Sequence, residues 1–133
     1  MKRDELVTST RETGRRYEKI AEEYLSKKGF ELLERNYRFG KCEIDLIFKL
    51  DDKIIFVEVK YRKSKAYGQP YMFISRKQKL NIIKASVKFV RNHKEFKGFI
   101  YRFDVVSVLG DTGETVHYPN AFTIDEFKFI KAL

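Results

Sequence analysis

Asp45, Glu58 and Lys60 are the residues of this 133-residue chain whose types and spacing could support chemistry. Asp45 interrupts an apolar run over 43–48, and the other two lie in a second run over 54–60 that is rich in β-branched residues. Side chains two residues apart share one face of a strand, so the Cα atoms of Glu58 and Lys60 would lie about 6.6 Å apart. Two aspartates between the runs suit a hairpin turn, which would bring Asp45 toward Glu58.

These groups suit metal-dependent hydrolysis of a phosphodiester. Neighbouring carboxylates repel each other and are costly to desolvate, and a divalent cation relieves that cost. Oxygen ligands favour Mg²⁺, Mn²⁺ or Ca²⁺ over Zn²⁺. A nearby lysine could position or deprotonate a water molecule, or neutralise charge on a phosphate. The alternative is a Glu58–Lys60 salt bridge at a strand end. The Glu-x-Lys pattern does not decide between them, because it occurs three times in the chain.

An amphipathic helix precedes these strands and carries a further acid. Tyr17, Ala21 and Tyr24 fall at helical spacing, and Gly29 ends the pattern. Glu18 lies at the border of this apolar stripe, so it could reach over a sheet and add a metal ligand. The alternative is an acid in the first turn of the helix, where the helix dipole favours it.

The other segments alternate between strand and helix patterns. We expect strands over 30–37, 43–48, 54–60, 101–109 and 114–118, a loop over 61–74, and helices from Ser75 to just before Gly98 and over 125–133. Arg102 and Asp104 share a strand face, where we expect an ion pair or a hydrogen bond to the loop, with a phosphate contact by Arg102 as the alternative. His117 is expected on a strand surface. The order predicts one α/β domain over 1–133, with a central mixed β-sheet flanked by helices.

The charge points to an anionic partner. The chain holds 28 Lys and Arg against 19 Asp and Glu, a net charge of +9. Residues 61–103 carry 12 basic side chains and one acidic side chain, a net +11, so this segment supplies more than the whole excess. Nucleic acid is the first candidate partner and a membrane surface the second, while a solvated basic face is the alternative. The basic helix lacks bulky apolar anchors, so we expect no membrane partner.

Several protein classes are excluded. Cys42 is the only cysteine, which rules out a disulfide within the chain and zinc sites built on several cysteines. No apolar run approaches the roughly 20 residues of a membrane-spanning helix. The N-terminus lacks the apolar core of a secretory signal, so we expect a cytoplasmic protein.

Basic and aromatic side chains follow the carboxylates. Basic residues track phosphates, and aromatic rings can stack on unpaired bases. The cations next to the site are Arg62, Lys63 and Lys65, interleaved with Tyr61, Tyr67 and Tyr71, and those on one side of the second long helix are Lys77, Lys84, Lys88 and Arg91. Packing of the rings and solvation of the cations are the alternatives.

Taken as a set, the motifs resemble one known family. They are Gly14, Glu18, Ala21, Tyr24-Leu25 and Gly29, then Glu34-Arg35-Asn36-Tyr37-Arg38, Glu43-Ile44-Asp45-Leu46-Ile47, Phe56-Val57-Glu58-Val59-Lys60-Tyr61-Arg62 and Arg102-Phe103-Asp104-Val105-Val106. Over about residues 14–108 the chain resembles the YraN family of small bacterial proteins. That family is similar to the PD-(D/E)XK nuclease superfamily, which includes Holliday-junction resolvases.

The resemblance implies a restriction-endonuclease-like fold and a role for each site residue. It assigns metal binding, with Mg²⁺ or Mn²⁺, to Asp45, Glu58, Val59 through its carbonyl, and Glu18. It makes Lys60 the catalytic lysine, and it makes Lys77 and Gln78 contacts to phosphate or to a metal-bound water. For Gln78 a structural alternative stays open, because Ser75-x-x-Gln78 is also a capping box.

We therefore expect a nucleic-acid-binding, metal-dependent endonuclease. Its substrate is expected to be DNA in preference to RNA, and branched or single-stranded DNA of repair and recombination. Resolvase-like relatives dimerise, so the resemblance also implies a possible homodimer. The alternative is a non-catalytic nucleic-acid-binding module that acts through partners.

Overall fold

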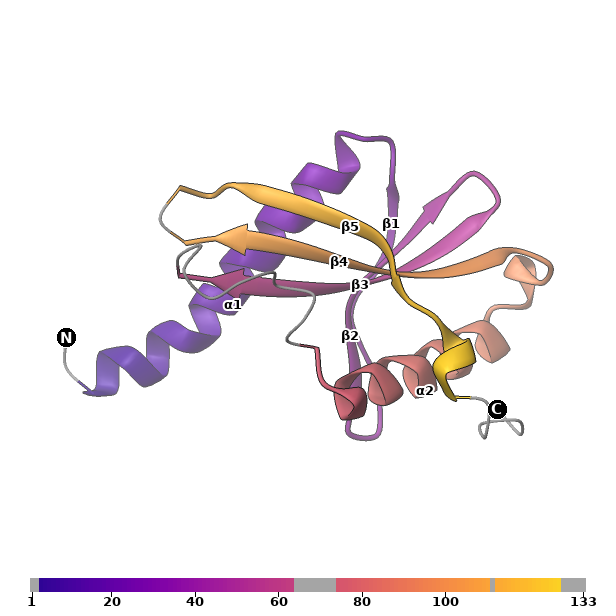
Figure 1. Cartoon of the computed structure of the whole chain (residues 1–133), viewed down its shortest axis with the longest axis horizontal. Coiled ribbons are helices and arrows are strands. Elements are labelled where there is room, and N and C mark those ends of the chain that lie inside the picture. Colours follow the sequence, from indigo (N-terminus) through magenta and orange to yellow (C-terminus); the bar gives the residue numbers. More distant parts are fainter. Residues whose placement is uncertain (1–2, 64–73, 111, 128–133) are drawn as a thin grey trace.

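A five-stranded sheet with one long helix on each face forms the protein (Figure 1). The computed structural model describes residues 3–63, 74–110 and 112–127, with side chains from residue 12 to residue 125 within those ranges. The elements in chain order are α1 (Arg3–Ser26), β1 (Glu31–Phe39), β2 (Cys42–Leu50), β3 (Lys53–Arg62), α2 (Arg76–Asn92), η3 (Lys94–Phe96), β4 (Ile100–Leu109), β5 (Thr115–Phe122) and η4 (Ile124–Phe127).

The sheet is mixed, as predicted. Its strand order is β1-β2-β3-β4-β5, and only β3 and β4 pair in parallel. Parallel neighbours need a crossover, and α2 supplies it. Three expected elements differ. The helix expected to run to just before Gly98 ends at Asn92 and is followed by η3, and β5 continues through Phe122. The expected last helix is only the short turn η4 before residue 128, and 128–133 lie outside the described residues. The architecture is consistent with a restriction-endonuclease-like fold.

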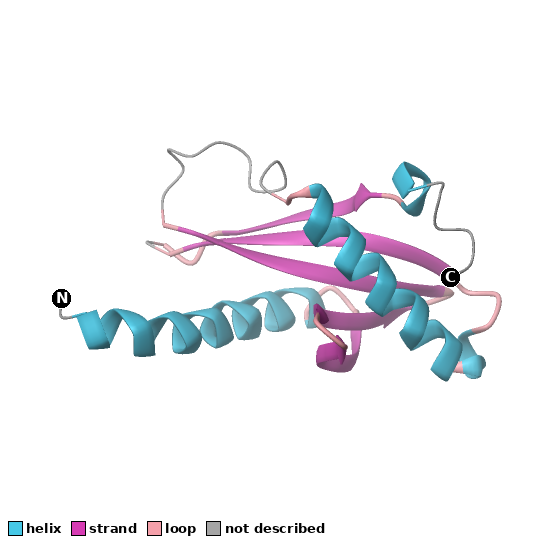
Figure 2. Ribbon diagram, turned by 90° about the horizontal axis from the view of Figure 1, so that it is seen from below, coloured by secondary structure: helices cyan, strands magenta, loops and turns pink. Residues whose placement is uncertain are grey.

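Two apolar clusters hold the layers together. Tyr17, Ala21 and Leu25 of α1 pack on one face of the sheet, as their helical spacing predicts. Ile83 and Phe89 of α2 pack on the opposite face. Figure 2 shows α1 running along one side of the strands while α2 crosses the other. No helix in the described part of the chain is long and apolar enough to cross a membrane.

The strand β2 has a neighbouring strand on both sides over only part of its length. It pairs with β3 only from Leu46 to Leu50, whereas it pairs with β1 from Cys42 to Lys49. The β1–β2 hairpin therefore leaves the sheet and bends toward α2 (Figure 1). Ile44 follows this bend into the α2 cluster, although alternation predicts it on the same face as Leu46, which packs in the α1 cluster. The bend opens a fork between β2 and β3.

Candidate active site at the fork between β2 and β3

Asp45 and Glu58 lie opposite each other at the fork. The ladder between β2 and β3 ends at Leu46 and Val57, and the next opposed positions are Asp45 and Glu58. Cross-strand partners share a face of the sheet. Beyond this point β2 offers no backbone carbonyl to the Val59 N–H, which instead donates to Oδ2 of Asp45 at 2.7 Å. The Asp45 carboxylate thus accepts the hydrogen bond that a β2 carbonyl would accept in a continuous ladder, and this bond fixes its orientation.

The pKa values of both carboxyls are raised. Burial is the main cause for Asp45, followed by the charge of Glu58, and together they hold its pKa well above the ordinary value even though the Val59 N–H lowers it. Burial raises the pKa of Glu58 to about 7, against the opposing effects of Lys60 and of a hydrogen bond with Asp45. Two carboxyl groups this close resist ionising together. A bound cation would stabilise the ionised form of such a pair.

Lys60 is the third member of the group. Its Nζ lies 3.9 Å from Oε1 of Glu58, and the two side chains are 20% and 15% exposed. Both project from β3 on the face covered by α2, as the spacing of two residues predicts. The salt bridge named as an alternative is therefore present, but it stands beside a buried acid pair rather than at an isolated strand end.

Asn36 links two further acids to this group. Its Nδ2 donates to Oε1 of Glu18 at 3.0 Å and to Oε1 of Glu43 at 3.2 Å. The charges of both acids raise the pKa values of Asp45 and Glu58. Asn36 has a φ of 48°, a left-handed conformation that is uncommon outside glycine. Neither residue was predicted to belong to the site. The signal for Glu43 is its spacing of two residues from Asp45, which places both acids on one strand face.

The donor set fits a magnesium-type ion with few protein ligands. In the described ranges no three His, Cys, Asp or Glu side chains lie close enough together to bind one metal ion. Glu18 therefore does not form a three-residue metal-binding group with Asp45 and Glu58. Mg²⁺ typically takes one or two carboxylates and completes its shell with water and substrate phosphates. The N–H and C=O of one strand residue leave the same strand edge, so the Val59 carbonyl also faces the fork.

A cavity of about 240 Å³ opens onto the carboxylates. It is lined by Lys41, Glu43, Asp45, Glu58, Gln78, Asn81 and Ile82. Gln78 forms the complete capping box with Ser75 at the start of α2, and it also lines this cavity. Lys41 and Asn81 were not predicted. They come to the site because the bent hairpin packs against α2, where the Cys42 thiol contacts Asn81 at 3.7 Å.

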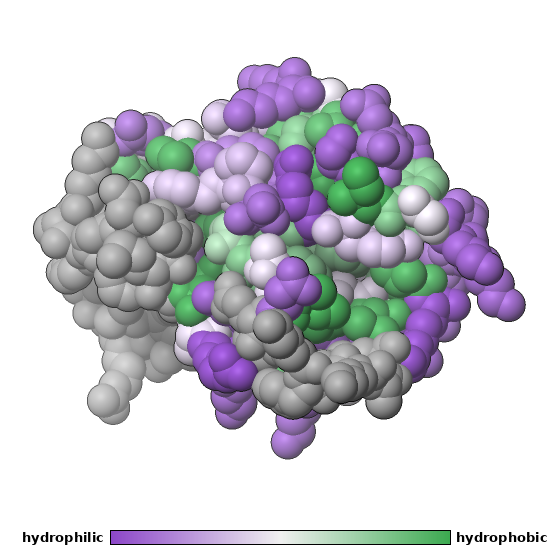
Figure 3. All heavy atoms as spheres, turned by 45° about the vertical axis from the view of Figure 1, so that its right-hand side comes forward, coloured by the Kyte–Doolittle hydropathy of each residue, from purple (hydrophilic) through white to green (hydrophobic). Residues whose placement is uncertain are grey.

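A larger cavity, separate from the acid pair, is lined by fewer groups that could take part in catalysis. It measures about 490 Å³ and is enclosed by α2, β4, β5 and η4. Its lining is mostly apolar, and Asp125 is the one carboxylate among the described residues that line it. On the face shown in Figure 3, hydrophobic side chains likewise gather at the centre, with hydrophilic ones around them. We therefore assign the candidate active site to the smaller, acidic cavity.

The predicted phosphate contacts divide into two groups. Exposed cations are Lys63, Lys77, Lys84, Lys88 and Arg91, and the last four follow one side of α2. Arg62 is half-buried, with Nη2 of its guanidinium enclosed, so it is less accessible to a phosphate. Tyr61 is 43% exposed and stacks on Tyr17 with ring centroids 4.3 Å apart. Lys65, Tyr67 and Tyr71 lie outside the described residues.

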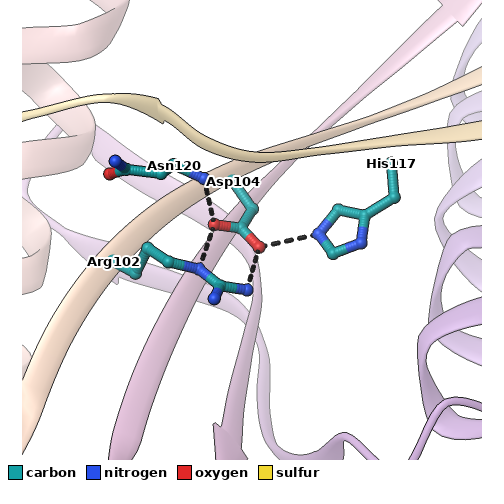
Figure 4. A network of polar contacts seen from close by, with 4 residues as sticks. All are labelled: Arg102, Asp104, His117 and Asn120. Atoms are coloured by element: carbon teal, nitrogen blue, oxygen red, sulfur yellow. Dashed lines mark hydrogen bonds and ion pairs between the residues drawn. The ribbon is translucent and has the colours of Figure 1, made fainter.

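A second polar network lies on the α1 face, around Asp104 (Figure 4). Arg102 donates to its two carboxylate oxygens, both at 2.8 Å, and the Asn120 N–H donates at 2.9 Å. Nε2 of His117 lies 2.7 Å from Oδ2. The expected ion pair is confirmed. The expected surface position of His117 is wrong, because its side chain is only 8% exposed and packs edge-on against Phe30.

The fold and the fork define the class: an α/β protein of restriction-endonuclease-like architecture with a buried carboxylate pair beside a lysine. The chain belongs to uncharacterised protein family UPF0102, the YraN family, whose model matches residues 17–108. It is 39% identical over 103 residues to the UPF0102 protein of Fusobacterium nucleatum, which covers 77% of this chain and 86% of that protein. It is 40% identical over 114 residues to the UPF0102 protein of Syntrophomonas wolfei, covering 84% and 98%.

Proposed function

We propose that this protein is a metal-dependent nuclease that hydrolyses phosphodiester bonds of DNA, with branched or single-stranded DNA as its substrate. One observation carries the proposal: two largely buried, opposed carboxyl groups, Asp45 and Glu58, face a cavity with Lys60 beside them. A structural core has no use for such a pair, because desolvating two acids side by side destabilises the fold. Acids that are costly to desolvate are retained chiefly at functional sites.

Each residue has a role in this proposal. Asp45, Glu58 and the Val59 carbonyl would bind Mg²⁺ or Mn²⁺, which supplies Lewis-acid activation when bound. The Lys60 ammonium lies beside Glu58, where it can orient the attacking water and balance negative charge that develops on the phosphate. The Val59 N–H holds Asp45 in one orientation. Glu18 and Glu43 are positioned by Asn36, and their negative charges would add to the attraction of the site for a cation.

The basic side of α2 suits the polyanion. Lys77, Lys84 and Lys88 are exposed along the helix whose start lines the acidic cavity. They would bind backbone phosphates, so affinity should fall steeply with salt. The proposal places the protein in the cytoplasm, in DNA repair or recombination. It includes a homodimer on branched DNA, since cutting two strands requires two sites.

The alternative is a nucleic-acid-binding module that has the fold without the chemistry. The exposed cations along α2, which would bind a polyanion with or without chemistry at the acids, are compatible with it. The two functions differ in what the site residues do. A nuclease loses cleavage and keeps binding when Lys60 is changed, whereas a binding module is indifferent to Lys60 and depends on the α2 lysines.

The test is a cleavage panel with wild type and Lys60→Ala. The substrates are a four-way junction, linear duplex, single-stranded DNA and single-stranded RNA, each with Mg²⁺ or Mn²⁺. We expect wild type to cut DNA and Lys60→Ala to be slower by about 10²- to 10³-fold, because one charge-stabilising group is lost. Binding without metal should be unchanged. If wild type cuts nothing in either metal but still binds the junction, the binding module replaces the nuclease.

Asn36 offers a test of the outer acids. Asn36→Gly keeps the left-handed backbone accessible and removes only the amide that links Glu18 to Glu43. We expect stability close to wild type and cleavage lower by about 10- to 100-fold, as is usual when a polar group outside the ligand shell of a metal site is lost. Asn36→Ala should in addition lower stability through backbone strain. Unchanged cleavage by Asn36→Gly would show that the bridge is only structural.

A further inference from the structure

The tip of the β1–β2 hairpin places an exposed aromatic ring near the candidate active site. Phe39 is 44% exposed, at the end of β1, and the chain turns there through Gly40, whose φ of 61° suits a tight turn. A large apolar ring exposed at a hairpin tip gains nothing from the core. Single exposed rings are common, so the ring's surroundings decide whether it has a role.

The surroundings of Phe39 are cationic. Nζ of Lys88 lies 5.7 Å from the ring centroid, as a cation over an aromatic face. Arg38 and Lys41, which lie close to it in the hairpin, are also exposed, and the Arg38 side chain is 73% exposed although its Nη2 lies 3.3 Å from Oε2 of Glu43. An aromatic ring among such cations is the arrangement that binds a base by stacking and its phosphates by charge. A protein partner would more often meet a wider apolar patch.

The hairpin also joins this ring to the acids. Phe39 pairs with Cys42, and three strand residues from Cys42 to Asp45 span about 10 Å. Lys41, two residues from Phe39, lines the cavity that holds Asp45 and Glu58. The ring and the acids would therefore be separated by about 10 Å along the hairpin.

We propose that Phe39 is a stacking platform for an unpaired base close to the scissile phosphate. This inference rests on the proposed function and sets its substrate class: nucleic acid with at least one unpaired nucleotide near the cut. A paired base inside a duplex has both faces covered by its neighbours, so it cannot stack on the ring. Lys88, Arg38 and Lys41 bind the phosphates on either side of the stacked base.

The test uses the absence of tryptophan from the sequence. Phe39→Trp places a single indole fluorophore at the platform while keeping an aromatic face. Titration with a single-stranded 12-mer in EDTA should quench its emission, and a covalently closed double-stranded circle at the same phosphate concentration, which has neither a loop nor an end, should quench it far less. Ile100→Trp is the matched control. Ile100 is also exposed, but it pairs with Lys53 at the opposite end of β3 from Glu58, so its emission should not change.

A second variant measures the energy of stacking. Phe39→Leu keeps an apolar side chain without a π face, and we expect its affinity for the single strand to fall by about 5- to 100-fold, with affinity for the duplex unchanged. If the single strand does not change the Phe39→Trp emission while wild type still shows Lys60-dependent cleavage, the stacking proposal is wrong and the proposed nuclease function is retained. If no nucleic acid binds and none is cut, both proposals are overturned.

Discussion

Replacing Glu58 with Gln should abolish cleavage and, at the same time, stabilise the metal-free protein at pH 8. The buried Glu58 carboxyl has its pKa raised from 4.5 to about 7, chiefly by burial. Between these values the folded protein binds more protons than the unfolded chain, so stability falls as pH rises. The loss is complete above about pH 7 and is on the order of 3 kcal/mol. Gln carries no charge at any pH and removes this loss.

The measurement is urea unfolding in EDTA at pH 5, 6, 7 and 8. Wild type should lose stability across this range, while Glu58→Gln should lose much less of it, the remainder coming from Asp45. Glu23→Gln, an exposed acid on α1, is the matched control and should follow the wild-type profile. A Glu58→Gln protein less stable than wild type at pH 8 would mean that the Lys60 ion pair outweighs the cost of burial.

Divalent cations give the same variant a second readout. A cation that binds only the folded protein raises its melting temperature by mass action. Mn²⁺ should therefore raise the melting temperature of wild type and leave that of Glu58→Gln nearly unchanged. Together the two measurements would show that the acid pair is kept for binding a cation at the expense of stability, which is the usual relation between an active site and its fold.

The central part of the site was predictable because it depends on local geometry. Alternation along β3 places Glu58 and Lys60 on one face, and a turn at Asp51, which has a φ of 53°, returns the chain so that Asp45 opposes Glu58. These features need only strand periodicity and turn chemistry. The same reasoning predicted the apolar stripe of α1 and the capping box of α2.

The outer part of the site was not predictable because it depends on a bend. Periodicity assumes a straight β2, but β2 leaves β3 at Leu46 and follows β1 toward α2. That bend brings Lys41 and Glu43 to the cavity and buries Ile44 on the unexpected face. Asn36 reaches Glu18 and Glu43 only through a left-handed backbone conformation, which its residue type permits but does not require. Packing between distant elements decides such features.

Asp104→Asn should be the most destabilising single substitution among those considered, by about 3 to 5 kcal/mol. Asp104 is fully buried and accepts from Arg102 and the Asn120 N–H, with His117 in contact. Burial would raise its pKa, but the bonds from His117, Arg102 and Asn120 outweigh burial and hold the pKa below its ordinary value. An Asn there leaves the Arg102 charge largely enclosed without its carboxylate, since the Arg102 side chain is 21% exposed.

The pH dependence of this loss has the opposite sign to that of Glu58. A carboxyl whose folded pKa is lowered contributes stability above its unfolded pKa and loses it as pH falls. The gap between wild type and Asp104→Asn should therefore be full at pH 7 and narrow below about pH 4. Asp125→Asn, an exposed control, should change stability by less than about 0.5 kcal/mol. Because Asp104 lies on the α1 face, Asp104→Asn protein that is still folded should cleave at the wild-type rate. A stable variant with slow cleavage would instead tie this network to the site.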